Sequence, residues 1–352
     1  MCEIYQGAAM PHIHGGDIYR NRVSMDFSVN VNPLGIPQSV RQAVQEAIGD
    51  CERYPDISAE RLLHAVSRMH GVPTGNVLLG NGASEILMAA VHGIMPGKTV
   101  IPVPSFYGYE YAAGAANGEI VYYSAKEEDN FRLGKDLYAA LSKDVDLLIL
   151  ANPGNPTGNL IGKTDLIKIL SHCKDYGIYV LVDECFIEFC SGDCSVISEI
   201  NHFSNLILIR AFTKIFSIPG IRLGYLICSN QQIVGKIGRH LPEWNISCFA
   251  HAAGCACASE MDYIKETAAF MRTERCFLTE GLRQSGCKVF PSEANFILCY
   301  SKEPLYERLL EQGILIRDCR NFRGLCEGFY RIAVRSREEN AKLLRVLQEV
   351  KG

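Results

Sequence analysis

The chain alternates between short, continuously apolar runs and amphipathic helical patterns. The apolar runs lie at 99–104, 145–153, 177–184, 205–212 and 221–229. Runs of this length without polar alternation predict strands that are buried on both faces, as in a parallel sheet. The helical patterns between them lie at 84–95, 134–143 and 164–177. This alternation predicts an α/β fold with a mostly parallel central sheet and flanking helices.

The pattern changes after residue 235. A helical stretch at 261–286 precedes strand candidates at 287–300, 314–319 and 329–335 and a last helix at 337–352. We expect a small α+β C-terminal domain here. The expected organisation is an N-terminal arm (1–40) closing over a cleft, a large domain (41–235), and a connecting helix with the small domain (236–352).

Charge and cysteine usage narrow the function classes. Lys plus Arg number 35 and Asp plus Glu 39, giving a net charge of −4 with no basic cluster, which argues against nucleic-acid binding and electrostatic membrane anchoring. No stretch approaches the ~18 apolar residues of a membrane span, and the first twenty residues lack the pattern of a signal peptide. The 15 cysteines are irregularly spaced without a Cys-x-x-Cys pair. We therefore expect reduced thiols in a cytoplasmic protein and no metal site.

Four segments carry candidate chemistry. They are Gly80–Glu85, Asn152–Gly158, Asp183-Glu184, and Thr213-Lys214 with Arg222 eight residues after the lysine. Taken singly, each has an ordinary interpretation: a helix start, a turn, a strand end that is either solvated or paired with a buried cation, and a surface lysine. Three of them follow apolar runs, so they belong at the carboxyl edge of the sheet, where open α/β sheets bind ligands.

One cofactor requires all four segments together. Pyridoxal 5′-phosphate needs a lysine that bonds to its aldehyde, an acid on its ring nitrogen, a donor to its phenolic oxygen, and backbone amides with an arginine for its phosphate. Lys214, Asp183, Asn155, and Gly82, Ala83 and Ser84 with Arg222 can fill these roles in that order.

The combination GNGASE, NPGNPTG, DE and TK followed by IPGIRLGY resembles the fold-type I pyridoxal-phosphate enzymes over essentially the whole chain. Within that fold, the chain is similar to the branch that holds histidinol-phosphate aminotransferases and the L-threonine-O-3-phosphate decarboxylases of cobalamin biosynthesis. Three segments resemble the decarboxylases: His14-Gly15-Gly16, Asp26–Pro33, and the C-terminal stretch from Arg317 to Arg335.

The resemblance implies further site residues. Phe106 would stack on the cofactor ring, Thr213 would contact its phosphate, and Tyr54 would reach the cofactor phosphate of the neighbouring subunit in a homodimer. Arg331 would hold the substrate carboxylate, and Arg317 with the His14 region would face the substrate phosphate. The expected substrate-facing set is His14, Gly15, Asn32, Asn155, Arg317 and Arg331. The residues alone leave open which arginine takes which anion.

Two positions depart from the branch pattern. Histidinol-phosphate aminotransferases usually carry a tyrosine three residues after the ring-nitrogen aspartate, whereas this chain has Phe186, which cannot donate a hydrogen bond. Ala211 stands three residues before the lysine, where a hydroxyl residue often binds phosphate, so Thr213 must supply that contact. The resemblance therefore implies decarboxylation of threonine phosphate, with serine-phosphate decarboxylation and histidinol-phosphate transamination as alternatives.

Overall fold

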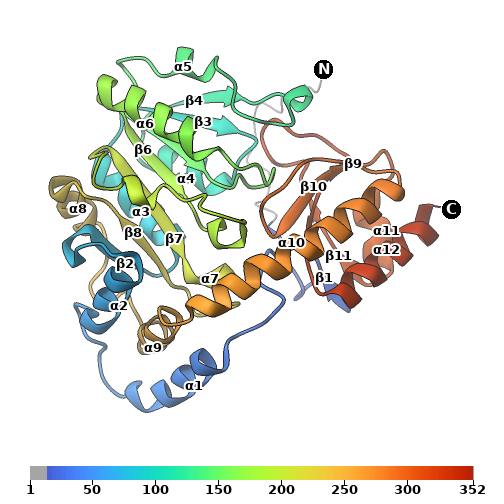
Figure 1. Ribbon diagram of the computed structural model, residues 1–352, viewed down its shortest axis with the longest axis horizontal. Coiled ribbons are helices and arrows are strands. Elements are labelled where there is room, and N and C mark those ends of the chain that lie inside the picture. The colour runs from blue at the N-terminus through green and yellow to red at the C-terminus, as the bar shows by residue number, and fades with distance from the viewer. Residues whose placement is uncertain (1–13, 352) are drawn as a thin grey trace.

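A seven-stranded sheet forms the centre of the large domain in the computed structural model, which describes residues 14–351 (Figure 1). Its strands, in spatial order, are β2 (Val77–Gly80), β8 (Gly224–Ile227), β7 (Leu206–Ala211), β6 (Tyr179–Asp183), β5 (Leu147–Ala151), β3 (Lys98–Val103) and β4 (Glu119–Ser124). Only β8 runs against its two neighbours. Every residue of β7 is buried, as expected for a strand covered on both faces.

Helices cover this sheet and account for most of the predicted helical patterns. They are α1 (Gln38–Glu46), α2 (Glu60–His70), α3 (Ala83–Ile94), α4 (Tyr107–Ala115), α5 (Leu137–Ala140), α6 (Lys163–Tyr176), α7 (Phe212–Ile215), α8 (Gln231–Gly238) and α9 (Cys248–Cys257). The predicted boundary at residue 235 falls inside α8, and α9 packs against α1 and α2. We propose that the large domain extends through α9.

The C-terminal part forms a second, antiparallel sheet in the order β12-β13-β10-β9. Its elements are α10 (Met261–Gln284), β9 (Lys288–Val289), β10 (Phe296–Tyr300), α11 (Leu305–Glu311), β12 (Arg317–Asp318), β13 (Phe329–Ala333) and α12 (Arg337–Lys351). The long helix α10 runs between the two parts (Figure 1) and contacts both the small sheet and the 3₁₀ turn Ile187–Phe189 of the large domain. This arrangement matches the expected α+β domain.

The N-terminal arm joins the two parts. Its strand β1 (Met25–Asp26) pairs in parallel with β11 (Ile314–Leu315) of the small domain. Further along, the backbone N–H of Asn32 donates to the carbonyl of Lys214 in the large domain. The arm thus crosses from one domain to the other before α1 begins. Its first thirteen residues lie outside the described part of the chain.

The structure differs from the sequence predictions in several elements, among them helices α1, α2, α4, α8 and α11, which were not predicted. The helix predicted over 134–143 is reduced to the four residues of α5, because the hydroxyl of Tyr123 binds both Asp136 Oδ1 (2.6 Å) and the backbone N–H of Gly134 (3.0 Å) and holds a turn there. Strands β2 and β4 were not predicted. Both are edge strands, and their apolar stretches, of three residues in β2 and four in β4, are shorter than the runs from which the other strands were predicted.

Candidate active site

A cavity of about 1000 Å³ opens at the carboxyl edge of the large sheet. The last residues of four strands, Val103, Ala151, Asp183 and Ala211, all line it. The N-terminal arm contributes His14, Gly15 and Ser28–Asn30, and the small domain contributes Arg317, Arg331 and residues 320–327. The four segments that carry candidate chemistry thus meet at the carboxyl edge of the sheet, as the sequence predicts.

Lys214 lies on the cavity wall in the single helical turn α7, directly after β7. Burial lowers the pKa of its ammonium group, and the neighbouring charges of Arg331 and Arg222 lower it further. Across the described residues, no hydrogen bond or ion pair engages its Nζ. A lysine with a depressed pKa is more readily deprotonated, and the free amine is the form that attacks an aldehyde.

Asp183 faces the same cavity from the end of β6. Its Oδ2 accepts a hydrogen bond from the hydroxyl of Tyr109 (2.7 Å), and its Oδ1 accepts from the backbone N–H of Cys185 (2.9 Å). Tyr109 is buried, and its pKa is raised well above 10 by burial and by the Asp183 charge, so it stays a donor. The two donors fix the carboxylate, which can hold a cationic ring nitrogen.

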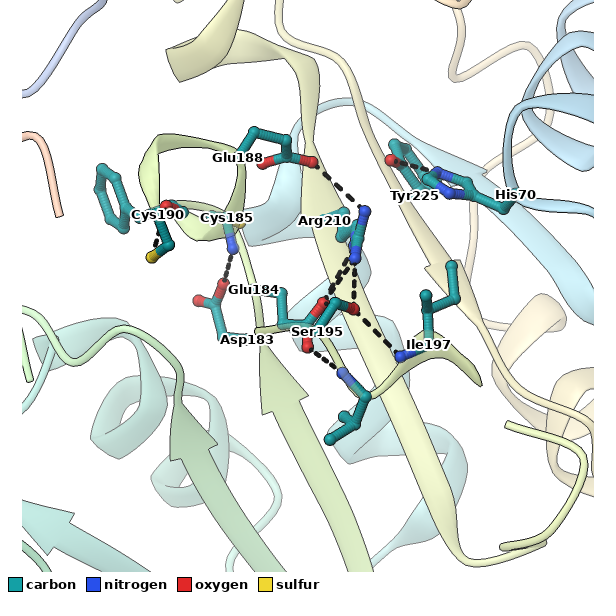
Figure 2. A network of polar contacts seen from close by, with 12 residues as sticks. His70, Asp183, Glu184, Cys185, Glu188, Cys190, Ser195, Ile197, Arg210 and Tyr225 are labelled. Carbon is teal, nitrogen blue, oxygen red and sulfur yellow. Dashed lines mark hydrogen bonds and ion pairs between the residues drawn. The ribbon is translucent and has the colours of Figure 1, made fainter. Parts of the chain in front are cut away.

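Glu184, the next residue, points to the other side of the strand and is completely buried. It accepts two hydrogen bonds from Arg210 of β7, at 2.7 Å from Nη2 and 3.1 Å from Nε. Ser195 and the backbone of Val196 complete its contacts (Figure 2). The sequence left open whether these acids are solvated or paired with a buried cation. Glu184 is paired with a buried cation, Arg210, and this pair holds the strand end that carries Asp183.

The start of α3 forms another part of the cavity wall. Gly82 precedes the helix with φ +82°, and a Cβ built on it would lie 2.5 Å from Nη2 of Arg222. Ala83 and Ser84 line the cavity in the first helical turn, where backbone N–H groups lack partners within the helix. Arg222 itself adopts φ +61°, a conformation that non-glycine residues rarely take. Such a cradle suits a phosphate group.

Asn155, Phe106 and Thr213 also line the cavity. The Oδ1 atom of Asn155 accepts a hydrogen bond from Nη1 of Arg331 (2.6 Å), which leaves its Nδ2 group as the donor that can face a ligand. The ring of Phe106 packs edge-on against Tyr109 at 5.6 Å and lies 6.5 Å from the ring of His14.

Arg317 and Arg331 lie side by side on β12 and β13, where they are register partners. Both are buried, and burial lowers the pKa of both, to about 10 for Arg331. Arg331 donates to Asn155 and to the carbonyl of Ser28 (2.8 Å), and Arg317 donates to Oδ1 of Asn321 (2.8 Å). Within residues 14–351, no carboxylate pairs with either arginine or with Arg222, so three cations face the cavity without a counter-ion.

Two expected site residues lie elsewhere. Asn32 is buried outside the cavity, because its amide donates to the carbonyl of Ile215 and to the hydroxyls of Tyr263 and Thr267 at 2.8–2.9 Å. The structure therefore corrects the expectation that it faces the substrate: the neighbouring Asn30 lines the cavity instead. Tyr54 is 80% exposed, and its ring packs on Trp244 at 5.0 Å. Its contact with the cofactor phosphate of a neighbouring subunit stays a prediction.

Several cavity residues were not identified from the sequence. Tyr109 follows Phe106 by one helical turn, a spacing that could have placed both rings on one face. Arg320 and Arg323 follow Arg317 in an arginine-rich stretch, but the ion pairs of Arg320 with Glu307 and of Arg323 with Glu110 depend on the tertiary structure. Across the described chain, no group of three or more His, Cys, Asp or Glu side chains is arranged to hold a metal ion. None of the helices there is long and apolar enough to cross a membrane.

The site has the residues that pyridoxal phosphate requires. A Cβ at Gly82 would fill the space next to Arg222, the Lys214 amine is unengaged, and the Asp183 carboxylate is fixed by two donors. A mostly parallel sheet that presents such an amine, acid and phosphate cradle at its carboxyl edge, with a small C-terminal domain closing the cavity, defines a fold-type I pyridoxal-phosphate-dependent enzyme.

Comparison with known proteins places the chain within that class. The family described as aminotransferase class I and II matches residues 22–347, and the chain belongs to this family, whose cofactor is pyridoxal phosphate. A threonine-phosphate decarboxylase from Salmonella typhimurium is 35% identical over 93% of this chain and 91% of its own length. The crystal structure of the histidinol-phosphate aminotransferase from Clostridium acetobutylicum has a TM-score of 0.88 at 37% identity, covering 93% of this chain and 99% of that one.

A more distant structure, the histidinol-phosphate aminotransferase from Sinorhizobium meliloti in complex with pyridoxal 5′-phosphate, shares the fold with a TM-score of 0.82. It is 24% identical and covers 94% of this chain and 91% of that one. Relatives of comparable similarity thus carry two activities. The comparisons define a pyridoxal-phosphate enzyme of this family, within which both activities occur.

Proposed function

We propose that this chain is a pyridoxal-phosphate-dependent decarboxylase that converts L-threonine O-3-phosphate into (R)-1-amino-2-propanol O-2-phosphate and carbon dioxide, as in cobalamin biosynthesis. The observation that carries the proposal is the set of three arginines, Arg222, Arg317 and Arg331, that face one cavity without a carboxylate partner. A cofactor phosphate, a substrate phosphate and a substrate carboxylate are three anionic groups, so the charges match one to one.

The positions of the arginines support a division of labour. Arg222 lies beside the start of α3 with Ala83 and Ser84, so we assign it to the cofactor phosphate. Arg331 donates to Asn155 and Ser28, which fix its position. It lies close enough to Lys214 for its charge to lower the pKa of the lysine. We assign it to the substrate carboxylate, which must lie close to the reacting carbon. Arg317 lies next to Arg331 and borders residues 320–327, so we assign it to the substrate phosphate.

Pyridoxal phosphate, when bound, supplies an electron-accepting ring that stabilises the electron pair left by a departing group. Asp183 would keep the ring nitrogen protonated, Asn155 Nδ2 would donate to the phenolic oxygen, and Phe106 would pack on the ring. By holding the substrate carboxylate, Arg331 would determine that the bond between the α-carbon and the carboxylate is the one that breaks. Lys214, after its amine takes up a proton from solvent, would then deliver that proton to the same carbon as a general acid.

Phe186 favours decarboxylation over transamination. Its ring lines the cavity beside Asp183 and packs edge-on against Phe296 at 5.1 Å, so an apolar surface stands where the aminotransferases of this branch usually have a phenol. Asn155 is then the main donor available to the phenolic oxygen. Histidinol-phosphate transamination with 2-oxoglutarate is the second candidate, because a histidinol-phosphate aminotransferase is among the most similar solved structures.

We also propose that the enzyme acts as a cytoplasmic homodimer in which Tyr54 contacts the cofactor phosphate of the second subunit. The exposed ring of Tyr54, supported by Trp244, is suited to such a contact.

A substrate panel tests the function. Purified enzyme with pyridoxal phosphate is incubated separately with threonine phosphate, serine phosphate, and histidinol phosphate plus 2-oxoglutarate, and carbon dioxide and glutamate are measured. We expect stoichiometric carbon dioxide from threonine phosphate, less from serine phosphate because one methyl is worth about 1–3 kcal/mol in a pocket, and no glutamate. Glutamate from histidinol phosphate without carbon dioxide from threonine phosphate would reverse the assignment.

A further inference from the structure

The segment 320–327 borders the cavity over its whole length, and every one of its residues lines it. It belongs to the small domain, between β12 and β13, and lies against the large domain. A Cβ built on Gly324, which has φ +86°, would be 3.7 Å from the backbone nitrogen of Pro104 at the end of β3. The segment therefore joins the two domains at the edge of the site.

Arg323 fastens this segment to the large domain. Its Nη2 donates to Oε1 of Glu110 in α4 at 2.8 Å, and its Nε donates to Oε2 at 3.3 Å. The guanidinium also lies 4.0 Å from the ring centroid of Tyr122 in β4. Arg323 thus combines a two-point ion pair with Glu110, 213 residues away in the sequence, and a cation–π contact with Tyr122.

The same segment orients Arg317. Oδ1 of Asn321 accepts from Nη2 of Arg317 at 2.8 Å, and the Arg317 guanidinium lies 5.1 Å from the ring centroid of Phe322. Arg317 has no carboxylate partner among the described residues, whereas Arg323 is matched by Glu110. One arginine is therefore held by a protein carboxylate, and the other remains available for an anion in the cavity.

We propose that Arg323 is a positioning residue for the substrate: its contacts with Glu110 and Tyr122 hold segment 320–327 across the cavity edge, and Asn321 and Phe322 thereby aim Arg317 at the substrate phosphate. The inference rests on the proposed function, which assigns the phosphate to Arg317. Arg323 acts through Asn321 and Phe322, because its own guanidinium, although on the cavity wall, is paired with Glu110. Because the side chains of Arg323 and Glu110 are 35% and 31% exposed, salt should weaken the pair.

The test uses holoenzyme carrying R323Q, E110Q, or the charge-reversed pair E110R/R323E. The E127Q variant is the matched control, because Glu127 and Lys288 also form an ion pair between the domains (2.7 Å), but neither lines the cavity. We expect R323Q and E110Q to raise KM for threonine phosphate about tenfold, the factor that corresponds to about 1.4 kcal/mol, and to change kcat less than twofold. The reversed pair should recover most of the KM, and E127Q should leave it unchanged.

A second readout does not depend on turnover. Phe322 is 8% exposed, so chymotrypsin should cut after it slowly in the wild type and in E127Q, and several times faster in R323Q and E110Q. A KM within twofold of wild type together with an unchanged cleavage rate in R323Q would overturn the proposal, as would an equal rise in KM in E127Q. If the wild type releases no carbon dioxide, the proposed function fails separately. KM is then measured with histidinol phosphate, and the cleavage comparison stands unchanged.

Discussion

Replacing Arg331 by lysine tests the proposal that this arginine holds the substrate carboxylate. An arginine side chain has five N–H groups. In Arg331 one N–H on each terminal nitrogen donates to Asn155 and Ser28, and the Nε–H is buried without a partner among the described residues. Each terminal nitrogen therefore keeps one N–H for a ligand. The ammonium group of lysine has three N–H groups at a single nitrogen, so R331K keeps the charge but cannot satisfy Asn155, Ser28 and a two-point carboxylate contact together.

The expected loss follows from that count. Truncating one partner of a buried, hydrogen-bonded charge pair costs about 2–5 kcal/mol. Because R331K keeps the charge, we expect the lower part of that range, about 2–3 kcal/mol, or a ~30- to ~160-fold fall in kcat/KM for threonine phosphate. Affinity for pyridoxal phosphate, measured by absorbance titration, should change little. The control R335K replaces an arginine outside the cavity that Glu339 already pairs with at 2.9 Å. A kcat/KM for R331K within threefold of wild type would refute the reasoning.

Three further predictions concern the Lys214 amine, the buried ion pair of Glu184 with Arg210, and the half-buried His70. K214A should lose turnover and the absorbance of lysine-bound cofactor, and a borohydride-fixed adduct on another lysine would contradict the assignment. E184Q should lower the free energy of unfolding by about 3–5 kcal/mol, because it leaves the buried Arg210 charge with a neutral partner in place of Glu184. This loss corresponds to a fall of about 4–7 °C in Tm. A fall of less than about 1 °C would contradict the prediction. Burial lowers the pKa of His70 to about 3, so the folded protein resists protonation while the unfolded chain takes up a proton below pH 6.5. Wild-type stability should therefore fall between pH 7 and 5 by about 1–2 kcal/mol more than that of H70N, as measured by urea unfolding at both values.

The cavity residues that the sequence could place best are those that directly follow a buried strand. Asp183 and Lys214 each come within three residues of the end of an apolar run, and the carboxyl ends of parallel strands meet at one edge. The α/β order and the small C-terminal domain were predictable because the hydrophobic periodicity of strands and helices is visible in the local sequence. The family comparisons confirm this fold and the cofactor.

Features that depend on distant partners could not be predicted. Tyr109 reaches Asp183 across 74 residues, and Arg323 reaches Glu110 across 213 residues, so no local pattern marks either pair. Asn32 was misplaced because a polar residue in a Pro- and Gly-rich arm has no periodicity that separates a ligand contact from a structural one. In the folded chain its amide instead satisfies the carbonyl of Ile215 and two hydroxyls.

The central claim is that the bond to the carboxylate breaks while the bond to the α-hydrogen stays intact. The most direct measurement is turnover of threonine phosphate in heavy water, followed by nuclear magnetic resonance of product and remaining substrate. Decarboxylation predicts a product that keeps the original α-hydrogen and carries one deuterium in place of the carboxylate, with no exchange in the remaining substrate. Deuterium at the α-carbon of recovered substrate, or keto acid in place of the amine, would show that the α-proton leaves and would contradict the account.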